Sequence, residues 1–389
     1  MEANFRMLAK TFFGFEDLLE SELKQLGAQS VEKGNRVVHF TGDKGFMYKA
    51  NLCLRTALKI LVPLYHCRVR SEDELYQAAY DYPWEEHFTE KETLAIDSVV
   101  FGETFTHSLY VSQKVKDAIA DRFRAKTGQR PSVNLKFPDV RINVHIDRDQ
   151  CNFSLDSSGA SLHHRGYRTA TNIAPLNEVL AAGLIMLSGW DQRSDFLDPM
   201  CGSGTIPIEA AMLSCKIPAN INRKEFAFEK WSNWDEDLYL TIEESQLNKI
   251  QGLAGSITGF DKAPSAVAKA RDNVRNANLE EFISIEKDNF FFSQKEQEGP
   301  LHIVTNPPYG ERLEGDINAL YGSLGDTLKQ HYTNTQAWMI TSNLEAMKHV
   351  GLRPSRKIKL FNGKLESRFL HYSIYPGTKK IHKLNSSSL

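Results

Sequence analysis

The spacing of hydrophobic residues changes its character near residue 157 of this chain. Before that point, stretches in which apolar and polar residues alternate predict strands, and stretches with apolar residues three and four positions apart predict helices. Strands are expected at residues 5–9, 36–40, 93–101, 140–146 and 151–155, and helices at residues 16–26, 46–58 and 108–126. These elements indicate two small α+β units in succession.

Beyond residue 172, apolar strands and amphipathic helices follow one another in regular alternation. Strands are expected at residues 195–197, 256–260, 282–286, 301–305, 338–341, 357–361 and 369–375, and helices at residues 175–187, 206–214, 264–276 and 320–330. This order is typical of a parallel α/β sheet, whose functional site lies at the carboxyl ends of the strands.

The chain has 389 residues, which is too long for one ordinary domain. We predict a first unit at residues 1–64, a second at 65–156, a linker at 157–172, the α/β domain at 173–378 and a disordered tail at 379–389. The linker is expected because this stretch is rich in Ser, Gly, His and Arg.

Composition narrows the class of protein. Apolar residues make up 41% and charged residues 25% of the chain, which is the balance of a globular protein with substantial cores. No apolar stretch approaches the roughly 20 residues of a membrane span, and the first residues lack the apolar segment of a secretory signal. The five cysteines show no metal-ligand spacing. We therefore expect a cytoplasmic protein with no metal and no membrane partner.

The net charge of −2 conceals a marked segregation of charge. Residues 348–389 contain ten Lys and Arg against one acid, and residues 114–136 contain seven against two. Basic segments on a nearly neutral protein indicate surfaces that meet phosphate groups.

The most informative motif is Asn306-Pro307-Pro308-Tyr309, which follows the apolar run at residues 301–305. Two consecutive prolines stiffen the chain and contribute no N–H groups. The amide of Asn306, the carbonyl of Pro307 and the ring of Tyr309 are therefore expected in fixed relation at a strand end. Such a set suits the binding of a planar amino group, such as the exocyclic amine of a nucleobase.

A glycine turn lies between another expected strand and helix, with the sequence Asp198-Pro199-Met200-Cys201-Gly202-Ser203-Gly204-Thr205. Its glycines allow close approach of the backbone to a ligand. Pro207 stands where a dinucleotide-binding motif has its third glycine, and Asp198 would repel a pyrophosphate but suits an ammonium group.

Two acids follow the next expected strands. Asp261 is placed to accept hydrogen bonds from ribose hydroxyls, and Asp288 from an adenine amino group. Asp261 lies about 60 residues beyond the glycine turn because an insertion, about residues 216–255, separates them. We expect Trp231 and Trp234 to pack this insertion onto the domain. A ligand with a ribose, an adenine and an ammonium group but no pyrophosphate is S-adenosylmethionine.

The segments LDPMCGSGT, GFDKAP, EKDNF and TNPPYGERL resemble, in order and spacing, the motifs of class I Rossmann-like methyltransferases that act on amino groups. Residues 154–168 and 174–184 are similar to the junction found in THUMP-domain RNA methyltransferases. Nearly the whole chain resembles the bacterial 23S rRNA guanine-N2 methyltransferases. The resemblance implies a ferredoxin-like unit, then a THUMP RNA-binding domain, then a Rossmann-like methyltransferase domain.

The resemblance also implies roles for individual residues. Asn306, Pro307, Pro308 and Tyr309 would be catalytic, with Tyr309 stacked on the target base. S-adenosylmethionine would be bound by Asp198, Pro199, Cys201, Gly202, Ser203, Gly204, Thr205, Asp261, Lys262, Asp288, Asn289 and Asn306. Lys114, Lys116, Arg122, Arg130, Arg165 and Arg168 would contact RNA.

Several alternatives stay open at this point. The same motif occurs in adenine-N6 and protein-glutamine methyltransferases, and THUMP domains also occur in tRNA-modifying enzymes, so tRNA guanine is the main alternative substrate. A non-catalytic RNA-binding factor could also retain this fold. The N-terminal module favours RNA, and the oligomeric state is left open.

Overall fold

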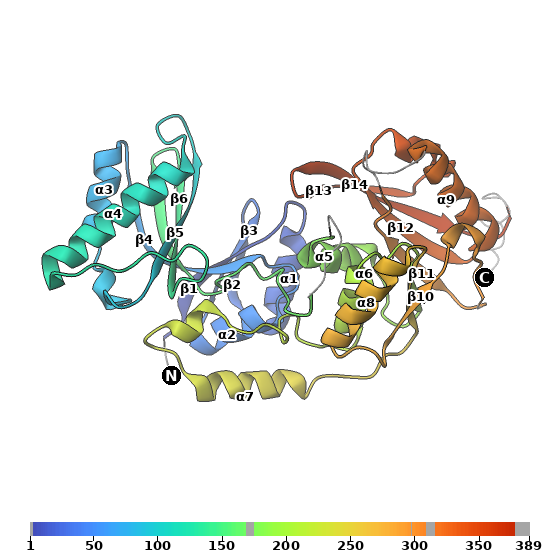
Figure 1. The fold of residues 1–389 in the computed structure, drawn as a ribbon, viewed down its shortest axis with the longest axis horizontal. Helices are drawn as coiled ribbons and strands as arrows, with labels where there is room; N and C mark the ends of the chain where they lie inside the picture. Colours follow the sequence, from blue (N-terminus) through green and yellow to red (C-terminus); the bar gives the residue numbers. More distant parts are fainter. Residues whose placement is uncertain (1–2, 169–174, 297, 309–315, 378–389) are drawn as a thin grey trace. The chain divides into compact units, whose positions relative to one another are not determined.

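The computed structural model describes residues 3–168, 175–296, 298–308 and 316–377, which form two compact units (Figure 1). As far as they are described, residues 1–11, 19–162 and 224–245 belong to unit 1, and residues 12–18, 163–223 and 246–389 belong to unit 2. Neither unit is a single continuous stretch of chain, because each contains a short segment taken from the other's part of the sequence.

Unit 1 is built on one seven-stranded sheet with the order β2-β3-β1-β4-β7-β6-β5. Its neighbouring strands are antiparallel except for β5 and β6. The strands are β1 (Phe5–Lys10), β2 (Gln29–Lys33), β3 (Val37–Gly42), β4 (Lys59–Arg68), β5 (Leu94–Phe101), β6 (Val140–Asp147) and β7 (Gln150–Asp156). The helices on this sheet are α1 (Glu16–Leu26), α2 (Lys44–Cys53), α3 (Glu72–Asp81), η1 (Trp84–Glu86) and α4 (Ser108–Thr127).

Strand β4 crosses the boundary predicted between residues 64 and 65. The two predicted α+β segments therefore share one sheet instead of forming separate ones. Pro63 hides this strand in the sequence, because proline is normally excluded from the interior of a sheet. The structure accommodates it with a register shift between Pro63 and Tyr65, where β4 pairs with β7.

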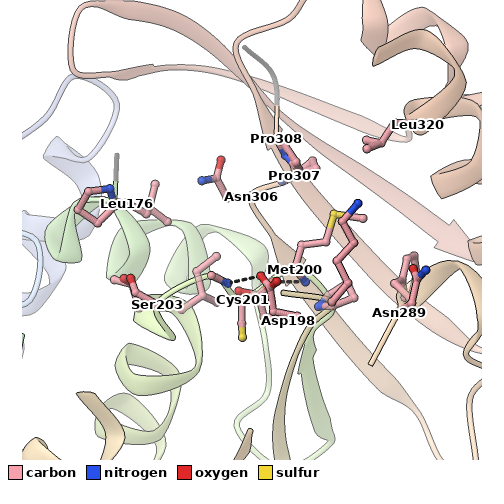
Figure 2. Close-up of a pocket in the computed structure, with 18 of the residues that line it drawn as sticks. Leu176, Asp198, Met200, Cys201, Ser203, Asn289, Asn306, Pro307, Pro308 and Leu320 are labelled. Carbon is pink, nitrogen blue, oxygen red and sulfur yellow. Dashed lines mark hydrogen bonds between the residues drawn. The ribbon is translucent and has the colours of Figure 1, made fainter. Parts of the chain in front are cut away.

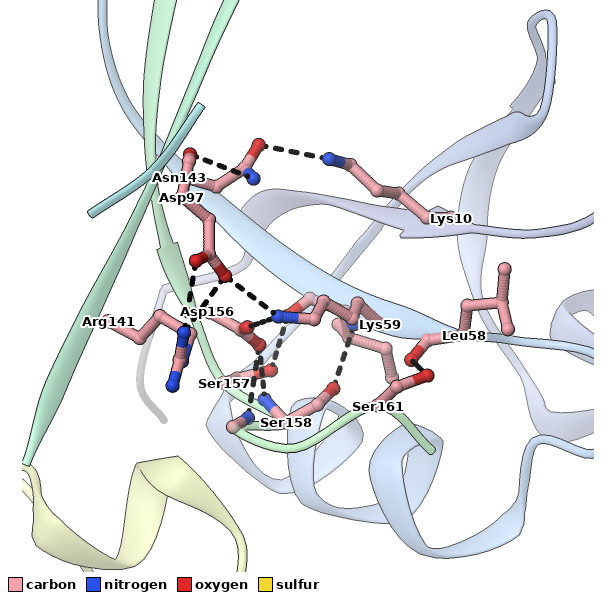
Figure 3. A network of polar contacts seen from close by, with 12 residues as sticks. Lys10, Leu58, Lys59, Asp97, Arg141, Asn143, Asp156, Ser157, Ser158 and Ser161 are labelled. Atoms are coloured by element: carbon pink, nitrogen blue, oxygen red, sulfur yellow. Dashed lines mark hydrogen bonds and ion pairs between the residues drawn. The ribbon is translucent and has the colours of Figure 1, made fainter. Parts of the chain in front are cut away.

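A network of polar side chains joins β4, β7, β6 and β5 of this sheet (Figure 3). The Nζ atom of Lys59 on β4 lies 2.5 Å from Asp156 at the end of β7 and 3.4 Å from Asp97 on β5. Arg141 on β6 pairs with the same Asp97 at 3.0 Å. Because Asp156 is buried, loss of its cationic partner would leave an uncompensated charge in the interior. The network thus helps to fix how these strands pair.

The insertion corrects an expectation about the α/β domain. Residues 224–245 belong to unit 1, and they include η2 (Ala227–Lys230) and most of α7 (Glu236–Leu247). Trp234 packs on Tyr48 of α2 with ring centroids 5.1 Å apart, and Phe228 packs on the same ring at 4.6 Å. Trp231 also contacts the unit 1 cores. These tryptophans therefore pack the segment onto the N-terminal module.

Unit 2 confirms the predicted α/β fold, with a sheet in the order β10-β9-β8-β11-β12-β14-β13. The first five strands are parallel, and β14 runs antiparallel to both β12 and β13. The strands are β8 (Asp195–Asp198), β9 (Ile257–Asp261), β10 (Ile283–Lys287), β11 (Leu301–Thr305), β12 (Thr335–Thr341), β13 (Arg356–Asn362) and β14 (Leu365–Ile374). The helices are α5 (Glu178–Ser188), α6 (Thr205–Ser214), α8 (Pro264–Asn276), η3 (Phe290–Phe292), α9 (Ile317–His331) and η4 (Ala346–Val350).

Helices cover both faces of this sheet (Figure 1). One core is formed with α5, α6 and α8, and the other with α9 and η4. Adjacent residues of a strand enter opposite cores, as Phe196 and Leu197 of β8 do, so β8 is buried on both sides. No helix in the described residues is long and apolar enough to cross a membrane.

Two glycines of α9 offer a test of this packing. A Cβ atom at Gly325 would lie 1.6 Å from the carbonyl oxygen of Val350, whereas at Gly322 the nearest atom would be 3.6 Å away. We expect Gly325→Ala to destabilise the protein by about 1–3 kcal/mol through overpacking. Gly322→Ala, the matched control, should stabilise it by about 0.5–1 kcal/mol because alanine favours helix. Calorimetric melting temperatures that shift equally in the two variants would contradict this packing.

Candidate functional site

A pocket of about 830 Å³ lies in unit 2 at the carboxyl ends of β8, β9, β10 and β11 (Figure 2). The chain proceeds from β8 to one side of the sheet and returns to its other side at β11. This reversal of strand order is where open α/β sheets bind their ligands. The pocket is lined by thirteen residues that the sequence had singled out: Asp198, Pro199, Cys201, Gly202, Ser203, Thr205, Asp261, Lys262, Asp288, Asn289, Asn306, Pro307 and Pro308.

The glycine turn connects β8 to α6 along the floor of this pocket. Gly202 and Gly204 have φ values of +55° and +81°, a left-handed conformation that favours glycine. The N–H of Gly202 donates to Oδ2 of Asp261 at 3.0 Å, and the N–H of Cys201 donates to the carbonyl of Phe260 at 2.8 Å. These bonds attach the turn to the end of β9. Gly204 shapes the turn without lining the pocket.

Asp198 ends β8 and is almost completely buried, with 1% of its surface exposed. Its Oδ1 atom accepts hydrogen bonds from Oγ1 of Thr305 at 2.9 Å and from the N–H of Met200 at 3.2 Å. Burial raises the pKa of this carboxyl to about 7, and the nearby Asp261 adds to the rise. A buried acid with so high a pKa is poised to become ionised when a cationic group enters beside it.

Asp261 and Asp288 follow β9 and β10 and face the same pocket. The oxygens of Asp261 accept from the N–H groups of Ala263 at 2.9 Å and Gly202 at 3.0 Å. Oδ1 of Asp288 accepts from the N–H of Asn289 at 2.7 Å. Since each carboxylate oxygen has two lone pairs, both acids retain capacity to accept hydrogen bonds from a ligand.

Asn306 follows β11 and presents an acceptor that the protein leaves unused. Its Oδ1 atom is buried and has no hydrogen-bond partner among the described residues. A buried polar atom without a hydrogen-bond partner costs free energy, so a ligand often supplies the missing hydrogen bond. Pro307 and Pro308 line the pocket beside it, and Tyr309 lies outside the described residues.

Apolar residues that the sequence did not reveal complete the pocket. Phe290 and Phe291 directly follow Asp288 and Asn289, so their position beside a predicted motif was an available signal. The helix predicted to begin at Pro175 begins instead after the cap Asn177. The other newly found lining residues are Pro175, Leu176, Met200, Ile206, Leu320, Ser342 and Leu365.

Two arginines predicted to contact RNA are internal instead. The side chain of Arg165 is fully buried, and its Nε atom lies 3.3 Å from Oε1 of the equally buried Glu209. Arg168 pairs with Glu178 at 2.8 Å, and it also donates to the hydroxyls of Ser203 at 3.1 Å and Thr205 at 2.8 Å. Burial thus excludes Arg165 from a phosphate contact, and Arg168 holds the glycine turn.

Cationic side chains of the basic helix α4 also form ion pairs that its sequence did not reveal. Arg122 forms two hydrogen bonds to Glu85, at 2.6 and 2.8 Å, so its charge is already paired. Lys114 lies 3.5 Å from Asp73. Two of the residues predicted to contact RNA, Lys116 and Arg130, line the same second pocket, which has a volume of about 400 Å³ and lies in unit 1.

The structure also bears on two other kinds of chemistry, nucleophilic attack by a cysteine thiolate and metal binding. Burial raises the pKa of the Cys201 thiol well above its usual value, which disfavours a nucleophilic thiolate. Among the described residues, no group of three or more His, Cys, Asp and Glu side chains is arranged to hold a metal ion.

Comparison with known families agrees with this architecture. Residues 165–370 match the RMKL-like methyltransferase domain, residues 69–156 match the THUMP domain, and residues 6–61 match the RlmL ferredoxin-like domain. The first of these covers more than half of the chain. The chain belongs to the RMKL-like methyltransferase family. The resemblance to THUMP-domain RNA methyltransferases that the motifs indicated is confirmed, and so is the predicted fold class.

Relatives of this RMKL-like methyltransferase include two curated proteins named ribosomal RNA large subunit methyltransferase K/L. The one from Syntrophotalea carbinolica is 38% identical over 96% of this chain and 54% of its own length. The one from Cellvibrio japonicus is 37% identical over 93% of this chain and 50% of its own length. The chain thus spans about half the length of the curated relatives it matches.

Solved structures resemble the RMKL-like chain over nearly its whole length. SMU.472, whose crystal structure is a complex with SAH, is 28% identical with a TM-score of 0.85, covering 97% of this chain and 100% of its own. A protein from Clostridium difficile 630, described as a possible methylase, is 30% identical with a TM-score of 0.85 and the same coverage. A Listeria monocytogenes protein described as a predicted N6-adenine-specific DNA methylase is 29% identical with a TM-score of 0.84, over 96% of this chain and 97% of its own.

The raised pKa of Asp198 predicts a pH dependence of stability in the ligand-free protein. The folded pKa is about 7, and the unfolded value is about 3.9. The contribution of this group is therefore fully present below about pH 4 and is lost as the pH rises through 7. Asp198→Asn cannot ionise, so its stability relative to the wild type should increase by up to a few kcal/mol between these pH values.

Urea titrations at a series of pH values would measure this difference. The exposed Asp272→Asn variant is the matched control and should follow the wild type. A difference between Asp198→Asn and the wild type that stays constant with pH would contradict the raised pKa.

Proposed function

We propose that this chain binds S-adenosylmethionine and transfers a methyl group to the exocyclic N2 amine of a guanine in RNA, with 23S rRNA as the favoured substrate. The observation that carries the proposal is the buried Oδ1 atom of Asn306, which has no hydrogen-bond partner among the described residues and lies beside two prolines in the pocket at the strand-order reversal. An acceptor held in a stiff loop suits an amino group that must be gripped and oriented.

The residues around the pocket fit this cofactor. Asp198 provides a buried carboxyl for the ammonium group, and Asp261 provides acceptors for the ribose hydroxyls. Phe290 and Phe291 provide an apolar wall for the adenine beside Asp288. The SAH complex of SMU.472, a structural neighbour over nearly the whole chain, supports this assignment.

S-adenosylmethionine supplies an electrophilic methyl group on a sulfonium. The lone pair of a guanine amine is delocalised into the ring, which makes the amine a poor nucleophile. Asn306 Oδ1 and the Pro307 carbonyl would each accept a hydrogen bond from one of its two N–H groups, which localises the lone pair and directs it toward the methyl group. The newly methylated amine carries a positive charge and readily releases one proton to solvent, so no strong base is required, and catalysis depends on positioning and on charge placement.

The base must leave its stack to reach a pocket at the strand ends, and Tyr309 would stack on it there. The THUMP domain favours RNA over DNA or protein as the substrate, and the curated relatives are named for ribosomal RNA. The N6-adenine name of the Listeria neighbour keeps adenine as the alternative base, and tRNA is the alternative RNA. A cytoplasmic location belongs to the same proposal.

Asn306→Ala should abolish methyl transfer, with a loss of at least about 100-fold, because the amine loses an acceptor that acts in the transition state. Its affinity for S-adenosylmethionine, measured by calorimetry, should stay within a few-fold. Tyr309→Ala should show the same separation of effects. Asn4→Ala, in unit 1 and distant in sequence from Asn306, controls for losses of activity that arise only from preparing a variant protein. An equal loss of affinity and activity would contradict the assignment.

The substrate itself can be identified by mass spectrometry of nucleosides from a strain that lacks the gene. We expect one N2-methylguanosine to disappear from 23S rRNA and to return when the full-length gene is restored. Loss confined to tRNA would change the substrate. Loss of N6-methyladenosine would change the base, and an unchanged profile together with no binding of S-adenosylmethionine would indicate a non-catalytic factor.

A further inference from the structure

The hairpin formed by β13 and β14 extends past the end of the sheet beside the pocket. The last residue of β12, Thr341, pairs with Arg368 of β14. Beyond that pair, β13 and β14 continue alone, from Leu360 opposite Ser367 to Asn362 opposite Leu365. At about 3.3 Å per residue, this hairpin tip (residues 360–367) reaches about 10 Å beyond the carboxyl end of β12.

An apolar side chain stands at the end of this hairpin tip. Leu365 is 55% exposed, and it lines the pocket that also contains Asn306 and Pro307. Side chains two residues apart share one face of a strand, so Leu365 continues the row of the buried Phe369 and Ser367 outward from the core. The protein thus places a large hydrophobic group at the solvent edge of the pocket, although it has no core to fill there.

The hairpin that carries this leucine is rich in cations. The segment from Arg356 to Arg368 carries five cationic side chains and one acid, Glu366. Glu366 is shared by Lys359 at 2.7 Å and Arg368 at 2.8 Å. Lys364, directly before Leu365, is exposed and has no ion-pair partner among the described residues.

Aromatic rings lie on the same hairpin. Phe361 packs edge to face on the part-exposed Phe13, with ring centroids 5.7 Å apart. The ammonium group of Lys359 lies 5.5 Å from the centroid of Phe361. Cations interleaved with aromatic rings are typical of surfaces that follow a nucleic-acid backbone.

We propose that the hairpin tip docks on the RNA backbone next to the target nucleotide and that Leu365 occupies the space the extruded base leaves in the stack. The inference rests on the proposed function, because it requires an RNA base to enter the pocket. Apolar side chains that insert at a base step are a general means of unstacking nucleic acid. An exposed leucine next to the exposed Lys364, at the edge of the pocket that would receive the base, meets the requirements of such a wedge.

The test uses two RNAs that contain the methylated guanine found by nucleoside analysis. One holds this guanine in a stem, and the other presents the same segment as an open strand. Leu365→Ala should lower kcat/KM for the stem by about 10-fold or more, because unstacking is then less well supported, and should change kcat/KM for the open strand less than about 3-fold. Leu365→Met retains the volume and should keep most of the stem activity. Leu240→Ala, at a leucine that is 50% exposed on α7, is the matched control.

Unstacking can be measured directly by replacing the target guanine with 2-aminopurine, whose fluorescence rises when it leaves the stack. With saturating wild-type protein the fluorescence of the stem should rise, and with Leu365→Ala the rise should be largely lost. Lys364→Ala should instead weaken binding and reduce the salt dependence of affinity by about one unit of slope, with the fluorescence at saturation preserved.

The outcomes separate the two proposals. Equal losses of Leu365→Ala on the stem and the open strand, or an unchanged fluorescence rise, would overturn the wedge and leave Leu365 as a wall of the pocket. A wild-type chain that methylates neither RNA would overturn the proposed function, and the wedge with it.

Discussion

The buried carboxyl group of Asp198 is the interaction around which the site is organised. It ends β8, accepts from Thr305 of β11 and receives the first N–H of the turn that leads to α6. The carboxyl therefore joins the two strands between which the sheet reverses its order. Its burial is costly unless a cation or a proton accompanies it, and the raised pKa expresses this cost. A cationic group bound beside Asp198 in the pocket would offset this cost.

The glycine turn depends on the same constraint. Asp261 holds the N–H of Gly202, and Arg168 holds the hydroxyls of Ser203 and Thr205 from the opposite side. The turn is thus fixed by side chains from β9 and from the segment before α5, so its N–H groups are preorganised. Asn306, stiffened by the prolines after it, faces this arrangement from the end of β11. A ligand bound on the turn and an amine bound at Asn306 would meet in one pocket.

Much of this site could be predicted because its signals are local. Each signal spans only a few positions: a polar residue directly after an apolar strand, a glycine turn before a helix, or a pair of prolines. Thirteen of the residues predicted from these signals line the pocket. The arginines were different. Arg165 and Arg168 have the sequence context of surface cations, but Glu209, 44 residues away, pairs with Arg165 in the interior, and Glu178 of α5 pairs with Arg168. A cationic residue in a sequence does not reveal whether the fold will place an acidic side chain next to it.

The sequence by itself determined the order of the strands in the α/β domain, the chemistry at their ends and the α/β class, because backbone preferences and hydrophobic periodicity act over short distances. Only the tertiary structure decided that both N-terminal units share one sheet through β4, that residues 224–245 join that module, and that Leu365 lines the same pocket as Asn306. Each of these depends on contacts between segments distant in the chain. Such contacts are selected by the burial of complementary surfaces, which no local pattern encodes.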